Sequence, residues 1–370
     1  MRFAPRMEQV LPSGVREFFD IARRLPDAID LSIGQVDFDV PDGVKAAVIE
    51  AVGAPGCGRY TATEGDPALV DAFRAHVRAV HGAGEDEAVI ATSGATGAII
   101  TAMLSLVGPG DEVLLPDPGF IVYGAAVRIA GGTPVFYDLY PDFRLRAAAI
   151  ERCITPRTRL LVLNNPANPT GAAFSAEEVA EVADLCRARD LFVLSDELYG
   201  PFTYDAPHAG LKPLLGDGCL LVGGPSKSHG MAGWRLGWAA GPASLIDRMR
   251  TLQQFLYACP PTPLQRGALA ALKCDMSPVV DRYRDKRDHA WSALVDAGYE
   301  VSRPGGAYYL FPKVPWGNDR SFCEAALSEK LVLVPGSTFS QQGTHFRMSF
   351  AAADDTLARG LEVLRRLATR

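Results

Sequence analysis

The stretch RLLVLNNPANPTGAAFSAEEVAEVADLCRARDLFVLSDE, residues 159–197, predicts a strand, a turn, a helix and a second strand. Its two ends, RLLVLN (159–164) and LFVLSDE (191–197), are short apolar runs of the kind that form buried strands. The segment between them, 175–190, has helical apolar spacing and opens with Ser175 and Glu178, a capping-box pair. Strand, helix and strand in succession predict a parallel pair within a sheet covered by helices.

Further strands are predicted around this unit, in EVLLP (112–116), TPVFYDL (133–139) and CLLVGG (219–224). The repetition predicts an α/β fold with a mainly parallel sheet, whose ligand sites lie past the carboxyl ends of the strands. The next apolar run starts at Trp234, and the roughly ten residues before it are too few for a parallel crossover. We therefore expect the strand that follows to be antiparallel to its neighbour, or not adjacent to it.

The rest of the chain predicts a second, smaller α/β unit. A long amphipathic helix is expected from Leu264 to Ala297, and strands are expected within 305–311, 331–339 and 345–351. The first forty residues precede the first parallel unit, so we assign them to the smaller part. The expected domains are a large domain of residues 42–262 and a small domain made from 1–41 plus 263–370.

Composition limits the classes of partner. The 370 residues include 48% hydrophobic and 22% charged residues, and the net charge of -6 provides no basic surface for nucleic acid. Residues 88–110 carry no charge, but Ser93, Gly94 and Gly97 interrupt them, so we predict a buried strand, a turn and a buried helix rather than a membrane span. We expect a protein whose partners are small molecules.

Cysteine and histidine spacing bears on compartment and metal content. The seven cysteines include no CxxC pair, which indicates a reducing, cytoplasmic compartment, and the N-terminal segment lacks the apolar core of a signal peptide. The six histidines show no HExxH or similar spacing, so no protein-bound metal is expected.

Lys227 lies in GGPSKSHGMAGWRLGW (223–238), among small residues rather than other charges. A lysine near a second cation has its ammonium form disfavoured, which makes the amine available as a nucleophile for carbonyl groups. Arg235 is the expected second cation, in an apolar strand, where a phosphate suits it better than a surface ion pair. The ordinary alternatives are a lysine that faces water and an arginine in a surface pair.

Asp196 directly follows a buried strand, where a carboxylate needs a partner. That partner is either a structural one, a helix N-cap or an ion pair, or the protonated ring nitrogen of a cofactor. Tyr199 and Asn168 can donate to a phenolic oxygen of such a ring, although Asn168 in NPTG is also a good turn residue.

Two further positions can bind anions. The turn at 93–97 leaves the N–H groups of Ala95 and Thr96 at the start of a helix, which is either an anion site or simply close packing. Arg347 alternates with the apolar Phe346 and Met348, so it faces the other side of its strand. It is either an exposed strand arginine or a clamp for a substrate carboxylate.

Together these segments resemble the class I/II aminotransferases, pyridoxal 5'-phosphate enzymes of fold type I. The block from Ser226 to Arg235 carries the most specific part of the resemblance, which extends from 12–22 to 346–351. The resemblance implies a mainly parallel seven-stranded sheet sandwiched by helices, and transfer of an amino group between an L-amino acid and a 2-keto acid. The same cofactor also serves β-lyases, decarboxylases and cyclases, which remain open as alternatives.

The resemblance also implies a role for individual residues. Lys227 would form the Schiff base, Asp196 would pair with the ring nitrogen, and Tyr199 would donate to the ring hydroxyl oxygen. The other implied contacts are ring stacking by Phe120, ring and substrate contacts by Asn168, phosphate binding by Ala95, Thr96, Ser226 and Arg235, substrate binding by Gly34 and Arg347, and a phosphate contact by Tyr60 across a homodimer.

The chain departs from the family pattern at two places. Gly224 stands where the family usually has a hydroxyl residue, and Leu69-Val70 replaces a leucine-arginine pair. These differences suggest weaker cofactor retention or specialised substrates. Tyr308 and Tyr309 can shape the substrate pocket without fixing its preference.

Overall fold

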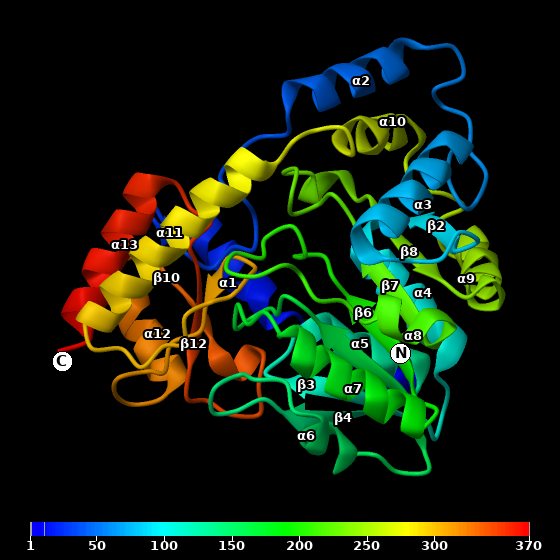
Figure 1. The fold of residues 1–370 in the computed structure, drawn as a ribbon. Helices are drawn as coiled ribbons and strands as arrows, with labels where there is room; N and C mark the ends of the chain where they lie inside the picture. The colour runs from blue at the N-terminus through cyan, green and yellow to red at the C-terminus, as the bar shows by residue number, and fades with distance from the viewer. Residues whose placement is uncertain (1, 11, 370) are drawn as a thin grey trace.

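The computed structural model describes residues 2–10 and 12–369, and its centre is a seven-stranded sheet (Figure 1). In spatial order the strands are β2 (Ala88–Thr92), β8 (Gly237–Gly241), β7 (Cys219–Gly223), β6 (Phe192–Asp196), β5 (Thr158–Asn164), β3 (Glu112–Asp117) and β4 (Thr133–Asp138). All neighbouring pairs are parallel except those of β8, which is antiparallel to both β2 and β7. The strand after Lys227 therefore takes the antiparallel arrangement, one of the two that were expected.

Helices cover both faces of this sheet, which confirms the predicted α/β class. One face packs on α4 (Gly94–Leu106), α5 (Ile121–Ala130) and α9 (Ala243–Leu256), and the other on α3 (Pro67–His81), α6 (Ala147–Glu151), α7 (Ala176–Ala188) and α8 (Lys212–Leu215). Alternation along β7 sends Leu220 and Val222 to the first face and Leu221 to the second. The predicted capping box is present at the start of α7, where the Glu178 N–H donates to Ser175 Oγ at 3.2 Å.

Both ends of the chain contribute to two smaller sheets. β1 (Ile29–Asp30) pairs in parallel with β10 (Leu331–Val332), and β12 (Phe346–Ser349) lies between β11 (Val334–Pro335) and β9 (Tyr309–Leu310). The helices of this part are α1 (Gly14–Arg24), α11 (Ser277–Asp296), α12 (Asp319–Ser328) and α13 (Asp354–Leu367), with α11 and α13 side by side in Figure 1. The domain boundaries given above remain a prediction.

The prediction of one continuous helix from 264 to 297 is wrong. The segment is divided into α10 (Thr262–Ala271) and α11, with Pro278 in the first turn of α11. Proline fits a first helical turn and disrupts a helix interior, so Pro278 is the signal for a new start. α10 packs instead on α2 (Asp42–Gly53) and α3, as the upper part of Figure 1 shows for α2.

The strand expected from Trp234 also begins later than predicted. Residues Ala232–Trp234 form a short 3-10 turn, Arg235 has a left-handed backbone with φ of 56°, and β8 starts at Gly237. The segment 88–110 forms β2, a turn and α4, as predicted. Within the described residues, no helix has both the length and the apolar character needed to cross a bilayer.

Candidate active site

A cavity of about 240 Å³ lies beyond the carboxyl ends of β5 and β6, and it collects every predicted site residue except Tyr60. Those residues are Gly34, Ala95, Thr96, Phe120, Asn168, Asp196, Tyr199, Ser226, Lys227, Arg235 and Arg347. Sequence reasoning gave no role to Tyr123 and Asn164, which line the same cavity. The position agrees with the rule that open α/β sheets bind ligands at the carboxyl ends of their strands.

Lys227 lies in the connection from β7 to β8, and its Nζ donates to the carbonyl oxygen of Gly34 at 2.7 Å. Burial, together with the positive charges of Arg347 and Arg235, lowers the pKa of Lys227 to about 8 against the opposing effect of Asp196. The predicted cause was Arg235 alone. Burial lowers the pKa of Lys227 most, and the charge of Arg347 lowers it more than that of Arg235 does.

Asp196 ends β6 with its carboxylate buried against α5. The hydroxyl of Tyr123 donates to Oδ2 at 2.7 Å, and the backbone N–H of Leu198 donates to Oδ1 at 3.2 Å. Burial, together with the negative charge of Glu197, raises the pKa of Asp196 to about 6 against the opposing effect of its two hydrogen bonds and of Lys227. Tyr123 follows Phe120 by one helical turn, so its position beside Phe120 was the available sequence signal.

Tyr199 and Asn168, the two predicted ring donors, are hydrogen-bonded to neighbours in the cavity wall. The hydroxyls of Tyr199 and Tyr309 lie 2.8 Å apart, and Asn168 Oδ1 accepts from Arg347 Nη1 at 3.0 Å. Asn164 braces this wall, because its side chain donates to the Asp196 carbonyl at 3.0 Å and accepts from the Asn168 N–H at 2.8 Å.

Arg347 is 1% exposed, so the reading of it as an exposed strand arginine is wrong. Its guanidinium carbon lies 4.6 Å from the ring centroids of both Tyr309 and Phe339, and Nη2 donates to the Ser32 carbonyl at 2.7 Å. Its Nε is buried without a hydrogen-bond partner, and burial lowers its pKa. A buried guanidinium that forms no ion pair with a described carboxylate can accept an anionic ligand.

The start of α4 and Arg235 form a cradle whose close contacts depend on glycine. A Cβ on Gly94 would lie 2.8 Å from Arg235 Nη2, and a Cβ on Gly237 would lie 2.5 Å from the backbone nitrogen of Ala95. The first N–H groups of a helix have no partner within the helix, so the cradle combines them with a guanidinium. Ser226 lines the same end of the cavity.

The two departures from the family pattern have packing explanations. A Cβ on Gly224 would lie 2.8 Å from Gly237 Cα and 3.0 Å from the Leu236 carbonyl oxygen, so a hydroxyl residue there would have to move β8. Leu69 and Val70 are buried in α3, against the core under β2 and β8. Packing accounts for both departures without any effect on cofactor retention.

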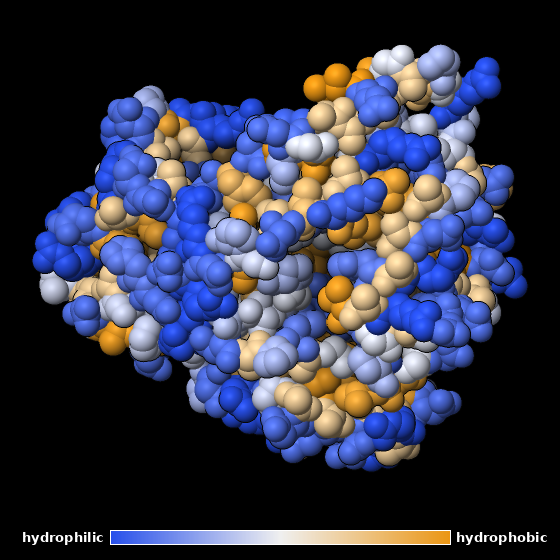
Figure 2. All heavy atoms as spheres, turned by 45° about the horizontal axis from the view of Figure 1, so that its top comes forward, coloured by the Kyte–Doolittle hydropathy of each residue, from blue (hydrophilic) through white to orange (hydrophobic). Residues whose placement is uncertain are grey.

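Tyr60 lies away from the cavity and is 84% exposed. Other large apolar side chains are exposed on α2, with Ile49 at 72%, and at the end of α9, with Phe255 at 82%. Figure 2 shows apolar patches scattered over a largely hydrophilic face. The predicted role of Tyr60 in a neighbouring subunit remains a prediction.

Comparison with known proteins agrees with this geometry. Residues 26–364 match the family model for class I and II aminotransferases. The chain is 35% identical to a probable N-acetyl-LL-diaminopimelate aminotransferase of Bacillus subtilis, over 97% of this chain and 94% of that protein. It is 34% identical to an aspartate aminotransferase of Pyrococcus abyssi, over 98% and 97%.

Among solved structures, the aspartate aminotransferase of Thermus thermophilus with maleate superposes with a TM-score of 0.95 at 31% identity, over 99% of this chain and 100% of that one. The similarity therefore includes both the large sheet and the smaller sheets. The chain belongs to the class I and II aminotransferase family, with the fold type I architecture, and it is a transferase of amino groups.

Proposed function

We propose that this aminotransferase uses pyridoxal 5'-phosphate, held covalently by Lys227, to move an amino group between an L-amino acid and a 2-keto acid. One observation carries the proposal: the Lys227 amine lines the same cavity as the buried Asp196 carboxylate and the buried Arg347 guanidinium. Among the described residues, the hydrogen-bond partners of all three are uncharged backbone groups, a phenol and an amide. Buried charges without partners are costly, and a ligand with matching groups would remove that cost.

The cavity residues fit this cofactor group by group. The cradle of Ala95, Thr96, Ser226 and Arg235 would bind the phosphate, Phe120 would stack on the ring, Asp196 would pair with the ring nitrogen, and Tyr199 and Asn168 would face the ring hydroxyl oxygen. The cradle supports the assignment because the guanidinium of Arg235 lies close against the helix start at Gly94, whose backbone is left-handed with φ of 69°. When bound, pyridoxal 5'-phosphate supplies a ring that accepts electron density from a bond broken at the substrate α-carbon.

The chain's own residues supply binding and proton transfer. Arg347 would bind the substrate carboxylate through its guanidinium group, whose Nε has no hydrogen-bond partner. Gly34 lines the same cavity and would lie near the same ligand. Lys227, with a pKa of about 8, would remove the α-proton and later return a proton, because an amine of this basicity exchanges protons near neutral pH. Asp196 would keep positive charge on the ring throughout.

The proposal includes a cytoplasmic homodimer with shared sites. Tyr60 is 84% exposed and does not line the cavity of its own chain, which supports a contact with the phosphate site of a neighbouring subunit. Large apolar side chains exposed on α2 and at the end of α9 are consistent with a covered surface. The proposed compartment rests on the sequence, in which the seven cysteines include no CxxC pair.

The substrate pair is the open part of the proposal, since relatives named for N-acetyl-LL-diaminopimelate and for aspartate are 35% and 34% identical to this chain. A half-reaction screen would separate them. The purified protein with cofactor is mixed with single amino acids, and loss of the cofactor absorbance is followed. A requirement for a keto acid in steady turnover would distinguish transamination from β-lyase, decarboxylase or cyclase chemistry.

Substitution of Lys227 tests the proposal directly. In Lys227→Ala we expect turnover to fall by about 10³-fold or more and borohydride to fix no cofactor to the protein. In the unaltered protein, peptide mapping after borohydride treatment is expected to find the label on Lys227 and not on Lys212 or Lys286, which are both deeply buried. Normal turnover by Lys227→Ala, or a label elsewhere, would contradict the proposal.

A further inference from the structure

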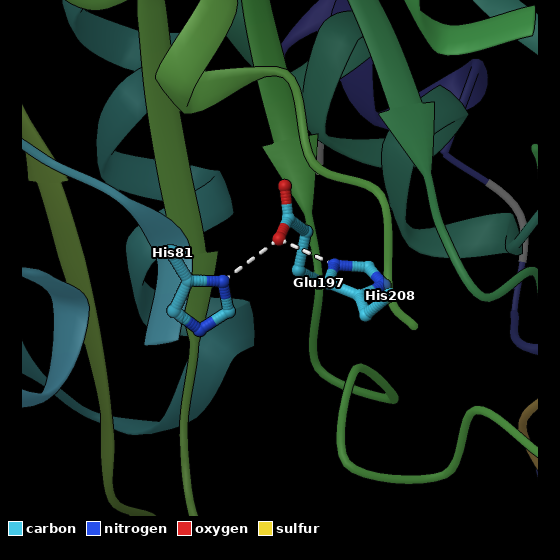
Figure 3. A group of neighbouring side chains, drawn as sticks. All are labelled: His81, Glu197 and His208. Carbon is cyan, nitrogen blue, oxygen red and sulfur yellow. Dashed lines mark hydrogen bonds and ion pairs between the residues drawn. The ribbon is translucent and has the colours of Figure 1, made fainter. Parts of the chain in front are cut away.

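A second buried carboxylate lies directly behind Asp196. Glu197 follows it in the chain and points to the opposite face of the sheet, toward α3 rather than α5. Its Oε2 lies 2.8 Å from His81 Nδ1 and 2.6 Å from His208 Nε2, and Ser195 Oγ donates to Oε1 at 2.8 Å. Figure 3 shows the carboxylate between the two imidazole rings.

This cluster ties the end of β6 to distant parts of the chain. His81 is the last residue of α3, and His208 lies in the loop that leads to α8. The loop backbone packs directly on the carboxylate, since a Cβ on Gly210 would lie 2.9 Å from both oxygens. The backbone of Glu197 is also fixed, because its N–H donates to the Val222 carbonyl at 3.0 Å.

Two imidazoles and a carboxylate are also a possible ligand set for zinc, and the three ligand atoms lie within 4.8 Å of one another. Here, however, both nitrogens are already at hydrogen-bond distance from one oxygen of Glu197. Ligands around a tetrahedral zinc at about 2.0–2.1 Å would be more than about 3 Å apart. The geometry therefore favours a carboxylate that is satisfied by three donors.

We propose that His81, Glu197 and His208 form a positioning unit that holds Asp196, and the residues that follow it, against the cofactor cavity. The inference rests on the proposed pairing of Asp196 with the cofactor. The unit acts in two ways. It fixes the strand end from the face opposite the cavity, and its donors offset the negative charge of Glu197, which would otherwise act on Asp196 at full strength.

The charge effect has a defined sign. Asp196 faces Tyr123 of α5, Lys227 of the β7–β8 connection, Tyr199, and Glu197 behind it. The pKa of Asp196 is raised to about 6, mainly by burial and in smaller part by the negative charge of Glu197. Loss of the Glu197 charge would lower this pKa, whereas loss of an imidazole donor would leave the charge less offset and raise it.

The experiment measures the dissociation constant of pyridoxal 5'-phosphate from the apoprotein as a function of pH, together with thermal stability. The variants are Glu197→Gln and His208→Phe. The matched control is Glu112→Gln, which removes another buried carboxylate, held by Thr155 at 2.5 Å and by Arg157, at the amino end of β3. Asp196→Asn serves as the reference for loss of the ring partner.

We expect Glu197→Gln and His208→Phe to weaken cofactor binding at pH 8 by about tenfold, the effect of one charged hydrogen bond. The pH below which affinity falls should move down in Glu197→Gln and up in His208→Phe. Glu112→Gln should lose stability and change neither quantity. Opposite shifts separate the proposed role from general destabilisation, which would not change sign between the two variants.

Two outcomes would overturn the positioning unit while leaving the proposed function intact. One is cofactor binding by Glu197→Gln and His208→Phe that matches Glu112→Gln at every pH. The other is one equivalent of zinc in the purified protein that is lost in His208→Phe. If Asp196→Asn itself bound the cofactor normally, the proposed function would fail, and the positioning unit with it.

Discussion

Arg287 and Arg347 are both completely buried, but their surroundings differ. Arg287 in α11 forms a two-point pair with Asp205, at 2.6 and 3.0 Å, and its Nε lies 2.8 Å from Asp288. Arg347 has only a carbonyl, an amide and two aromatic rings. Burial opposes the charge of both, yet the pKa of Arg287 is raised by its carboxylates, whereas that of Arg347 is lowered.

The contrast separates a structural charge from one that is kept for a ligand. A buried arginine with carboxylates is complete within the fold, and removing Arg287 would leave Asp205 and Asp288 with Arg303 as their remaining charged partner. A buried arginine without a carboxylate partner lowers the stability of the fold, and a bound anion would offset that loss. The same distinction applies to Glu197, with three donors, and Asp196, with a phenol and one backbone N–H.

The largest expected effect is on catalysis in Arg347→Gln. Because the substrate carboxylate would lose a charged, buried partner, we expect kcat/KM to fall by about 10²–10³-fold, mainly through KM. Stability should be unchanged or higher, since an uncompensated buried charge is removed. Steady-state kinetics and urea unfolding measure both. A stability loss with unaltered KM would mean that Arg347 is structural after all.

Arg287→Gln should show the reverse pattern. We expect a loss of about 1.5–3 kcal/mol of unfolding free energy, the value of hydrogen bonds between charged groups, because Asp205 and Asp288 are each partly exposed and can regain water. The kcat/KM of the folded variant should stay within about twofold of the unaltered protein. A fall in kcat/KM that matches Arg347→Gln would remove the distinction between the two arginines.

The smallest effect concerns the pH at which the apoprotein captures the cofactor. The neutral amine is the reactive form, so the capture rate should rise about tenfold per pH unit below the pKa of Lys227, about 8, and level off above it. Arg347→Gln removes a positive charge beside Lys227 and should move this midpoint to higher pH. Arg287→Gln should leave it in place. Stopped-flow absorbance measures the midpoint, and equal shifts in both variants would show that the charge of Arg347 does not reach Lys227.

Sequence reasoning predicted the features of the fold that come from local pattern. The buried strands of the large sheet are continuous apolar runs, and the short connection after β7 limited how β8 could pair. The break between α10 and α11 was missed because helical periodicity continues across it, although Pro278 marks it. The late start of β8 was missed because Trp234 and Leu236 look like strand residues while Arg235 adopts a left-handed turn.

For the site, the sequence indicated polar groups at strand ends, and the structure brings these together. It gave no indication of Tyr123 and Asn164, or of the pairing between His81, Glu197 and His208, since those contacts join elements far apart in the chain. It also gave no reason for Gly224, because the crowding arises from the backbone of β8. Contacts between distant segments depend on the folded arrangement, not on local spacing.

The bond from Lys227 to the carbonyl oxygen of Gly34 joins the β7–β8 connection to the segment between β1 and α2. The same oxygen also accepts from the hydroxyl of Tyr308 at 3.0 Å. An amine that is committed to another atom must give up this attachment, which leaves the tyrosine as the remaining anchor. We therefore expect cofactor attachment to Lys227 to increase the mobility of the residues near Gly34.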